Sequence, residues 1–160
     1  MVGAERYSQY TGYLETYEYA GNFQDERKAI ELKISENYTV VVKDTWISAI
    51  DAIPYFISSE FNNNNLNREL NKAYVGFNIM GLDGGQKAIS TGNWGSGAFN
   101  GNLEYKFLIQ WLAASRAHRS IDYFSFANPM ADDIPKIVKK YSELTVKQLM
   151  EILTKNSQKF

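Results

Sequence analysis

The residues best suited to bind a ligand lie between Thr91 and Gly101, with the sequence Thr-Gly-Asn-Trp-Gly-Ser-Gly-Ala-Phe-Asn-Gly. They follow a predicted strand at 87–90 and precede an apolar helical pattern that begins after Asn102. A strand that turns through glycines into a helix presents backbone N–H groups and the positive end of the helix dipole, which favour a phosphate or diphosphate. The stretch has neither the Gly-Lys-Ser/Thr ending of a Walker loop nor the dinucleotide fingerprint. It therefore predicts either a generic phosphate-binding loop or a tight connection in which Trp94 and Phe99 only pack.

Three aromatic residues could stack a base or a ribose beside such a loop. Tyr13 lies in a glycine-flanked segment without apolar period, and Phe99 ends the glycine-rich stretch. Phe126 ends a predicted strand at 121–126, and ligands of open α/β sheets collect at the carboxyl ends of strands. The alternative is that these rings belong to the core, as most phenylalanines on strands do.

Acidic and metal-binding groups give a weaker signal. The chain has no adjacent Glu-Glu pair, and Asp132–Asp133 lies at a predicted helix start, where the helix dipole accounts for it. Asp51 and Glu15 are possible acids without a specific pattern, and His118 near a helix end is better explained as solvated than as a general base. With no cysteine and one histidine, a thiolate zinc site and a histidine cluster are excluded, and no metal or cofactor is predicted.

The composition fits one compact domain. The 160 residues are 44% apolar, and 17 basic against 18 acidic residues leave no strong field that would attract DNA or an anionic membrane. No apolar stretch approaches the length of a membrane helix, and no leader pattern opens the chain. We expect an intracellular protein, nuclear or cytoplasmic.

Strands and helices are expected to alternate, which indicates an α/β fold with a largely parallel sheet. The stretch 7–19 is expected to be irregular, and asparagines at 62–65 are expected to cap a helix. Strands are predicted at 38–42, 45–53, 87–90 and 121–126, a turn at 81–85, and helices after 62–65, after 102, at 129–141 and at 145–153.

Five segments resemble poly(ADP-ribose) glycohydrolases, in that family's order and approximate spacing. They are Tyr7-Ser-Gln-Tyr-Thr-Gly-Tyr-Leu-Glu-Thr-Tyr, Ala49-Ile-Asp-Ala, Asn67-Arg-Glu-Leu-Asn-Lys-Ala-Tyr-Val-Gly-Phe, Thr91-Gly-Asn-Trp-Gly-Ser-Gly-Ala-Phe and Tyr123-Phe-Ser-Phe. The resemblance runs from Gly3 to about Leu153 and corresponds to the C-terminal half of the catalytic macrodomain.

The resemblance implies a macrodomain-like three-layer α/β/α sandwich, of which residues 1–160 form the C-terminal portion, with an ADP-ribose cleft at the ends of its strands. Residues 93–99 would surround the diphosphate and the neighbouring ribose, Phe99 would pack on that ribose, and Tyr13 and Phe126 would border the adenine. The predicted ADP-ribose-binding residues are Tyr13, Asn93, Trp94, Gly95, Ser96, Gly97, Ala98, Phe99 and Phe126.

The chain departs from the family pattern at several positions. Ser96 stands where the family often has cysteine, Asn100 replaces a glycine, Asn102 replaces an aspartate, and Ala127-Asn128 replaces Gly-Asp. Because asparagine also caps helices, the change at Asn102 should matter little.

The family's acid motif, a triple glycine followed by Gln-Glu-Glu, is not found in the 160 residues. The resemblance therefore implies hydrolysis of ribose–ribose O-glycosidic bonds in poly(ADP-ribose), with no catalytic acid from this chain. We expect the chain alone to be inactive and to need a partner, either a missing N-terminal half or another protein chain that covers the open sheet. The alternative is an inactive structural or interaction module of a larger assembly that binds ADP-ribose or has lost that ability.

Overall fold

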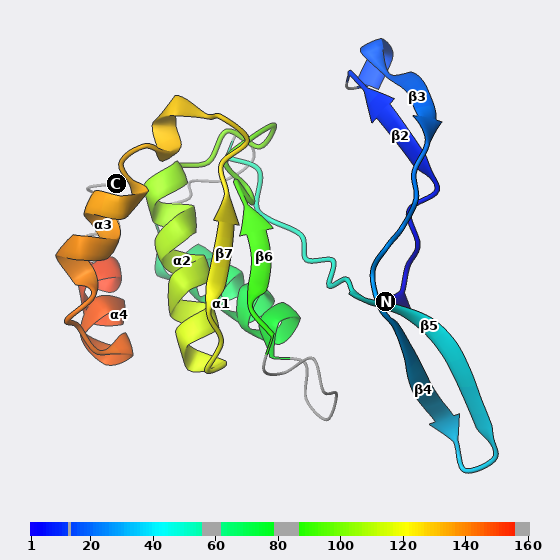
Figure 1. The fold of residues 1–160 in the computed structure, drawn as a ribbon. Coiled ribbons are helices and arrows are strands. Elements are labelled where there is room, and N and C mark those ends of the chain that lie inside the picture. The colour runs from blue at the N-terminus through cyan, green and yellow to red at the C-terminus, as the bar shows by residue number, and fades with distance from the viewer. Residues whose placement is uncertain (13, 56–61, 79–86, 156–160) are drawn as a thin grey trace. The chain divides into compact units, whose positions relative to one another are not determined.

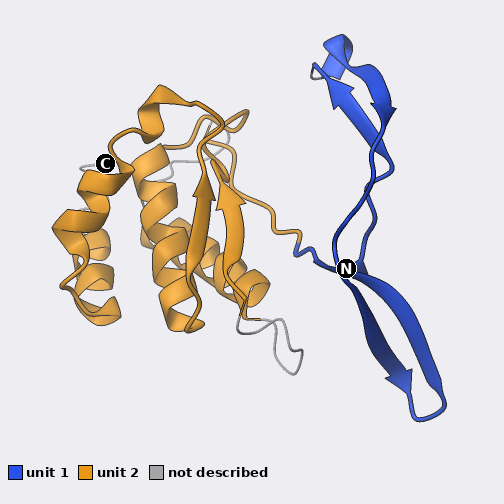
Figure 2. Cartoon of the chain, viewed as in Figure 1, with its two compact units in different colours: residues 1–48 blue, residues 49–160 orange. Residues whose placement is uncertain are grey.

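The computed structural model describes residues 1–12, 14–55, 62–78 and 87–155. The chain divides into two compact units, residues 1–48 and residues 49–160, which Figure 2 colours separately. We describe each unit by itself.

Unit 1, residues 1–48, consists of short antiparallel strands. Strand β1 (Val2–Gly3) and strand β4 (Ala29–Ser35) flank β5 (Tyr38–Trp46), so that the order is β1-β5-β4. A separate hairpin joins β2 (Ser8–Thr11) and β3 (Glu18–Asn22) through the 3-10 turn η1 (Leu14–Thr16). None of the described residues of this unit is buried, so unit 1 has no hydrophobic core of its own.

Unit 2, residues 49–160, combines a parallel strand pair with helices (Figure 1). Strands β6 (Ile89–Gly92) and β7 (Ile121–Phe124) pair in parallel, with Ile89 opposite Ile121. The helical elements are α1 (Asn63–Phe77), α2 (Leu103–Arg116), the 3-10 turn η3 (Pro129–Ala131), α3 (Ile134–Tyr141) and α4 (Val146–Lys155). Helix α2 lies between β6 and β7 in the chain and is the crossover connection that a parallel pair requires.

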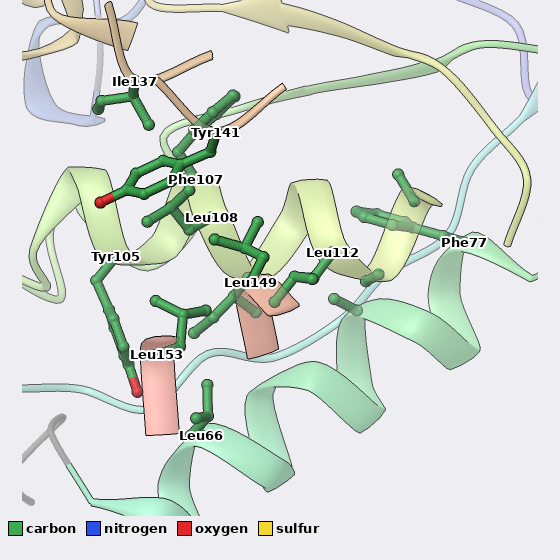
Figure 3. Packing of buried hydrophobic residues seen from close by; sticks show 14 of the residues in the cluster. Leu66, Phe77, Tyr105, Phe107, Leu108, Leu112, Ile137, Tyr141, Leu149 and Leu153 are labelled. Atoms are coloured by element: carbon green, nitrogen blue, oxygen red, sulfur yellow. The ribbon is translucent and has the colours of Figure 1, made fainter. Parts of the chain in front are cut away.

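The core of unit 2 forms around α2 (Figure 3). Tyr105 and Leu108 on this helix are fully buried, and their neighbours come from the other three helices. The side chains contributed by those helices are Leu66 and Phe77 from α1, Ile137 and Tyr141 from α3, and Leu149 and Leu153 from α4. At roughly 25 cal/mol per Å² of apolar surface removed from water, this cluster is the main source of stability in unit 2. It fixes α2, and through α2 the loop that precedes it.

Side-chain caps begin two of these helices as the sequence predicts. Asn62 accepts a hydrogen bond from the Asn65 backbone N–H at 2.8 Å, and Asn102 accepts one from the Tyr105 N–H at 2.8 Å. The asparagine tract is therefore partly inside α1, which begins at Asn63. The cap at Asn102 confirms that asparagine can replace the family's aspartate at this position.

Three predicted elements are wrong in their details. The stretch 7–19 is not irregular, because β2 and the start of β3 lie in it. The sequence shows no alternation of apolar residues there, since most side chains of both strands are exposed. The strands predicted at 38–42 and 45–53 are one strand, β5, which runs through Lys43 and Asp44 and ends at Trp46. Residues 47–53 are not in a strand; there the Ile50 carbonyl accepts from Trp94 Nε1 and the Ile53 N–H donates to Glu69. The predicted helix 129–141 is divided into η3 and α3, because a continuous helix would place Pro135 in its interior.

The other predictions agree with the structure to within a few residues. A parallel pair is present at β6 and β7, whereas the sheet of unit 1 is antiparallel, so the expected parallel character holds only for unit 2. The predicted turn at 81–85 lies outside the described residues. That residues 1–160 form one part of a single larger macrodomain stays a prediction.

Candidate functional site

The glycine-rich loop joins the carboxyl end of β6 to the N-terminus of α2, as the sequence predicts. Within it, the Ser96 N–H donates to the Asn93 carbonyl at 3.1 Å, and the Gly101 N–H donates to the Gly95 carbonyl at 3.0 Å. The loop is thus folded on itself by backbone bonds. A ligand at this place would face the end of a parallel strand and the start of a helix.

Asn93 is fixed by β7 and the residue that follows it. Its side-chain amide donates to the Ser125 carbonyl at 2.9 Å, and its Oδ1 accepts from the Tyr123 hydroxyl at 2.8 Å. Burial raises the pKa of Tyr123 to about 12, so the hydroxyl keeps its proton and remains a donor at neutral pH. The Asn93 side chain is therefore set in one orientation before any ligand arrives.

Trp94 and Gly95 form the back of the loop. The Trp94 indole N–H donates to the Ile50 carbonyl at 3.2 Å. Gly95 has a φ of +74°, and a Cβ placed on it would lie 2.9 Å from Lys106 Cε and 3.0 Å from Ala52 Cβ. Only glycine satisfies both the left-handed backbone and this close approach.

A buried ion pair supports this part of the loop. Lys106 Nζ lies 2.9 Å from Glu69 Oε2, and the two side chains are 1% and 2% exposed. The other Glu69 oxygen accepts from the Ile53 N–H at 2.6 Å, and the Lys106 ammonium lies 5.5 Å from the centre of the Trp94 ring. The pair joins α1 to α2 directly behind the loop. Neither residue was selected from the sequence, although Glu69 falls in a segment that resembles the family.

The tip of the loop faces solvent. Gly97, Ala98 and Phe99 are exposed, and a Cβ on Gly97 would meet no atom within 4 Å. The Phe99 carbonyl accepts from the Tyr55 N–H at 3.0 Å, while the Phe99 ring stays 38% exposed. Ser96 Oγ is buried and has no hydrogen-bond partner among the described residues. The accessible tip and the unpaired hydroxyl are the features of this loop that a ligand could use.

Phe126 lies beside the start of the loop. A Cβ on Gly92 would be 3.3 Å from the Phe126 ring, and the Phe126 side chain is 84% exposed. The structure therefore brings Phe126 to the loop but does not place it in the core. Tyr13 lies outside the described residues, so its position beside the loop stays a prediction.

Two departures from the family's glycines fall on unusual backbone. Asn100 has a φ of 57° and Ala127 a φ of 56°, both in the left-handed region that favours glycine. Asparagine tolerates this region better than alanine does. Ala127 is therefore the more strained of the two, and it follows Phe126, whose φ of 52° also lies in the left-handed region.

In residues 1–12, 14–55, 62–78 and 87–155, no three His, Asp or Glu side chains gather as metal ligands. No helix in the described part of the chain combines the length and apolar character needed to cross a membrane.

Comparison with known proteins decides the family. Residues 1–133 match the family model described as poly(ADP-ribose) glycohydrolase, macro domain fold. The chain belongs to the poly(ADP-ribose) glycohydrolase family. The α/β macrodomain-like fold class is thereby confirmed, and the glycine loop of this glycohydrolase-family chain lies within the matched residues.

Individual relatives agree with the family match. The chain is 29% identical to a probable poly(ADP-ribose) glycohydrolase 2 of Arabidopsis thaliana, over 98% of this chain and 36% of the relative. It is 33% identical to poly(ADP-ribose) glycohydrolase 1 of Caenorhabditis elegans, over 91% of this chain and 19% of the relative. The glycohydrolase-family chain thus spans only a fifth to a third or so of the length of these relatives.

Proposed function

We propose that this chain provides the diphosphate- and ribose-binding part of a poly(ADP-ribose) glycohydrolase, which hydrolyses ribose–ribose O-glycosidic bonds in the polymer. The observation that carries the proposal is the fixed strand–loop–helix turn at 92–103, which lies inside the family match. The names of the relatives support the substrate class.

The loop suits a diphosphate for three reasons. Its backbone is held by internal bonds and by the core beneath α2, so that little order has to be gained on binding. The dipole of α2 is positive at this end. The Ser96 hydroxyl, which has no hydrogen-bond partner among the described residues, could donate to a phosphate oxygen after a small movement of its side chain.

Phe99 and Phe126 suit the flat and apolar parts of ADP-ribose. Both rings are exposed beside the loop. Covering an exposed phenylalanine ring with a ligand removes apolar surface from water, which is favourable. We assign Phe99 to the ribose next to the diphosphate and Phe126 to the adenine edge. Exposed aromatic side chains of this kind are used to stack bases in many nucleotide sites.

Glycoside cleavage also needs an acid beside the scissile bond and support for an oxocarbenium-like transition state. The 160 residues contain neither a Gly-Gly-Gly nor a Gln-Glu-Glu sequence. We assign the acid to a segment outside these residues and give this chain the task of positioning the substrate. Positioning of this kind can contribute several kcal/mol to catalysis, because reacting groups must be held within a small fraction of an ångström.

The test is reconstitution. The chain is co-expressed with a segment that bears the Gly-Gly-Gly and Gln-Glu-Glu motifs, and release of ADP-ribose from poly(ADP-ribose) is measured. We expect activity that falls about 100-fold in Asn93→Ala and Phe99→Ala and is unchanged in Asn71→Ala, a matched change at an exposed position of α1. A well-folded but inert complex would instead favour the inactive interaction module, and unchanged rates in both loop variants would remove the loop from the substrate site.

A further inference from the structure

Strand β4 is the longer of the two edge strands of the sheet in unit 1. The sheet order is β1-β5-β4, and β4 pairs with β5 from Ala29 opposite Lys43 to Ser35 opposite Tyr38 (Figure 1). An edge strand of this length presents unpaired backbone groups that another strand can use.

The backbone pattern shows which residues face outward. The Asp44 N–H donates to the Lys28 carbonyl at 2.8 Å, so residues 28 and 44 form a bonded pair. Antiparallel partners alternate between bonded and non-bonded pairs. The N–H and C=O groups of Ala29, Glu31 and Lys33 therefore point away from β5.

The sequence of this edge is complementary to itself. It reads Ile30-Glu31-Leu32-Lys33-Ile34, so a second antiparallel copy centred on Leu32 places Glu31 opposite Lys33 of that copy, and Lys33 opposite its Glu31. Both residues of each such pair have outward-facing backbone groups, so the same register also satisfies the hydrogen bonds. Glu31 and Lys33 are exposed, and neither has an ion pair with another described residue.

The opposite face of the hairpin is apolar. Residues 30 and 32 of β4 share this face with residues 38, 40 and 42 of β5, and these five are isoleucine, leucine, valine and tyrosine side chains. The pairing shifts register between Lys33 and Ser35, so the regular part of the edge ends at Lys33. Tyr38 is 59% exposed. A hairpin without a covered face is at best marginally stable in water, so pairing at the edge would stabilise unit 1.

We propose that two copies of this chain associate through β4, edge to edge and antiparallel, with the twofold axis at Leu32. The contact is isologous, since each copy offers the same strand, and it joins the two sheets into one. Two Glu31–Lys33 pairs lie on one face, and a Leu32–Leu32 pair lies on the other. This association goes beyond the proposed function and does not require ADP-ribose binding.

A charge exchange tests the register. Sedimentation velocity of the full chain over a range of concentrations is expected to show a monomer–dimer equilibrium. Glu31→Lys and Lys33→Glu each turn both attractions into repulsions, so each should raise the dimer Kd by about tenfold or more. The double variant Glu31→Lys/Lys33→Glu restores opposite signs and should restore the wild-type Kd. Lys147→Glu, an exposed change of the same charge on α4, is the control and should have no effect.

A cross-link tests the axis itself. The chain has no cysteine, and position 32 faces its own copy in a non-bonded pair, where the Cα atoms lie about 4.5 Å apart, within the range of a disulfide. Leu32→Cys should therefore form a covalent dimer under mild oxidation. Val41→Cys is a stringent control, because Val41 is 70% exposed but lies on β5, away from the edge.

Three results would overturn the proposal. The first is that the chain stays monomeric at every concentration. The second is that the dimer Kd is unchanged by the single charge reversals. The third is that the cysteine at position 41 cross-links as fast as the cysteine at position 32. Circular dichroism of each variant shows whether the fold is retained, and all the substituted side chains are at least partly exposed.

Discussion

Substituting Gly95 by alanine should destabilise unit 2, whereas the same change two residues further on should not. At Gly95 the backbone has a φ of +74°, and the new Cβ would lie 2.9 Å from Lys106 Cε and 3.0 Å from Ala52 Cβ. At Gly97 the new Cβ would meet nothing within 4 Å. The two glycines belong to one loop and differ in backbone conformation and in what surrounds them.

The magnitude follows from two contributions. A left-handed conformation costs an L-residue about 1–2 kcal/mol, and crowding a packed site costs about 1–3 kcal/mol. We expect Gly95→Ala to lower the free energy of unfolding by about 2–4 kcal/mol. Gly97→Ala should change it by no more than about 0.5 kcal/mol, as is usual for surface substitutions, or raise it slightly by restricting the unfolded chain.

Urea denaturation followed by tryptophan fluorescence measures both changes, because Trp94 is next to Gly95 and Trp111 packs against the core. A Gly95→Ala variant that unfolds at the wild-type urea concentration would refute the close approach to Lys106 and Ala52. Equal losses in the two variants would show that the loop responds to any added side chain, and not to these contacts.

Four further predictions concern the surroundings of the loop. Lys106→Met should lower the free energy of unfolding by about 3 kcal/mol, because the buried Glu69 carboxylate loses its closer countercharge and keeps only Arg68 Nη1 at 3.5 Å. The double variant Lys106→Met/Glu69→Gln should recover part of that loss in a double-mutant cycle by urea denaturation, and additive losses would argue against the pair. Ser96→Ala should leave stability unchanged or higher, since it removes a buried hydroxyl with no described partner, while calorimetry on the reconstituted complex should show weaker ADP-ribose binding. Burial raises the pKa of Tyr123 to about 12, whereas a tyrosine in the unfolded chain ionises at about pH 10. The free energy of unfolding should therefore be independent of this group below about pH 10 and should fall as the pH rises toward 12. In Tyr123→Phe the fall should be less steep. Ala127→Gly should raise the melting temperature, because the left-handed backbone conformation costs alanine about 1 kcal/mol more than glycine. A lower melting temperature would contradict the strain at this residue.

The candidate loop could be predicted from the sequence because its signals are local. Glycines mark the turn, an asparagine caps the following helix, and the apolar period after Leu103 shows which side of α2 is buried. The structure adds the partners of each residue. That Asn93 is held by Tyr123 and Ser125 depends on the pairing of β6 with β7, which no local pattern contains.

The Glu69–Lys106 pair could not be predicted for a similar reason. Charged residues on helices are usually solvated, and only the packing of α1 on α2 makes these two an exception. In unit 1 the prediction failed on strand boundaries. The run from Tyr38 to Ile53 is rich in β-branched residues throughout, but strand β5 ends at Trp46, and Ile47 still bonds to Met1. Ile50 and Ile53 already belong to unit 2, where they bond to Trp94 and Glu69.

The central claim, that the loop at 93–99 binds the diphosphate of ADP-ribose, is tested most directly by NMR. Backbone amide resonances of the chain, isotopically labelled within the reconstituted complex, are followed during titration with ADP-ribose. We predict the largest shifts at Asn93, Gly95, Ser96 and Gly97, with smaller ones at Phe126. Saturable binding that leaves these loop amides unmoved, or a folded complex that binds no ADP-ribose at all, would contradict the claim.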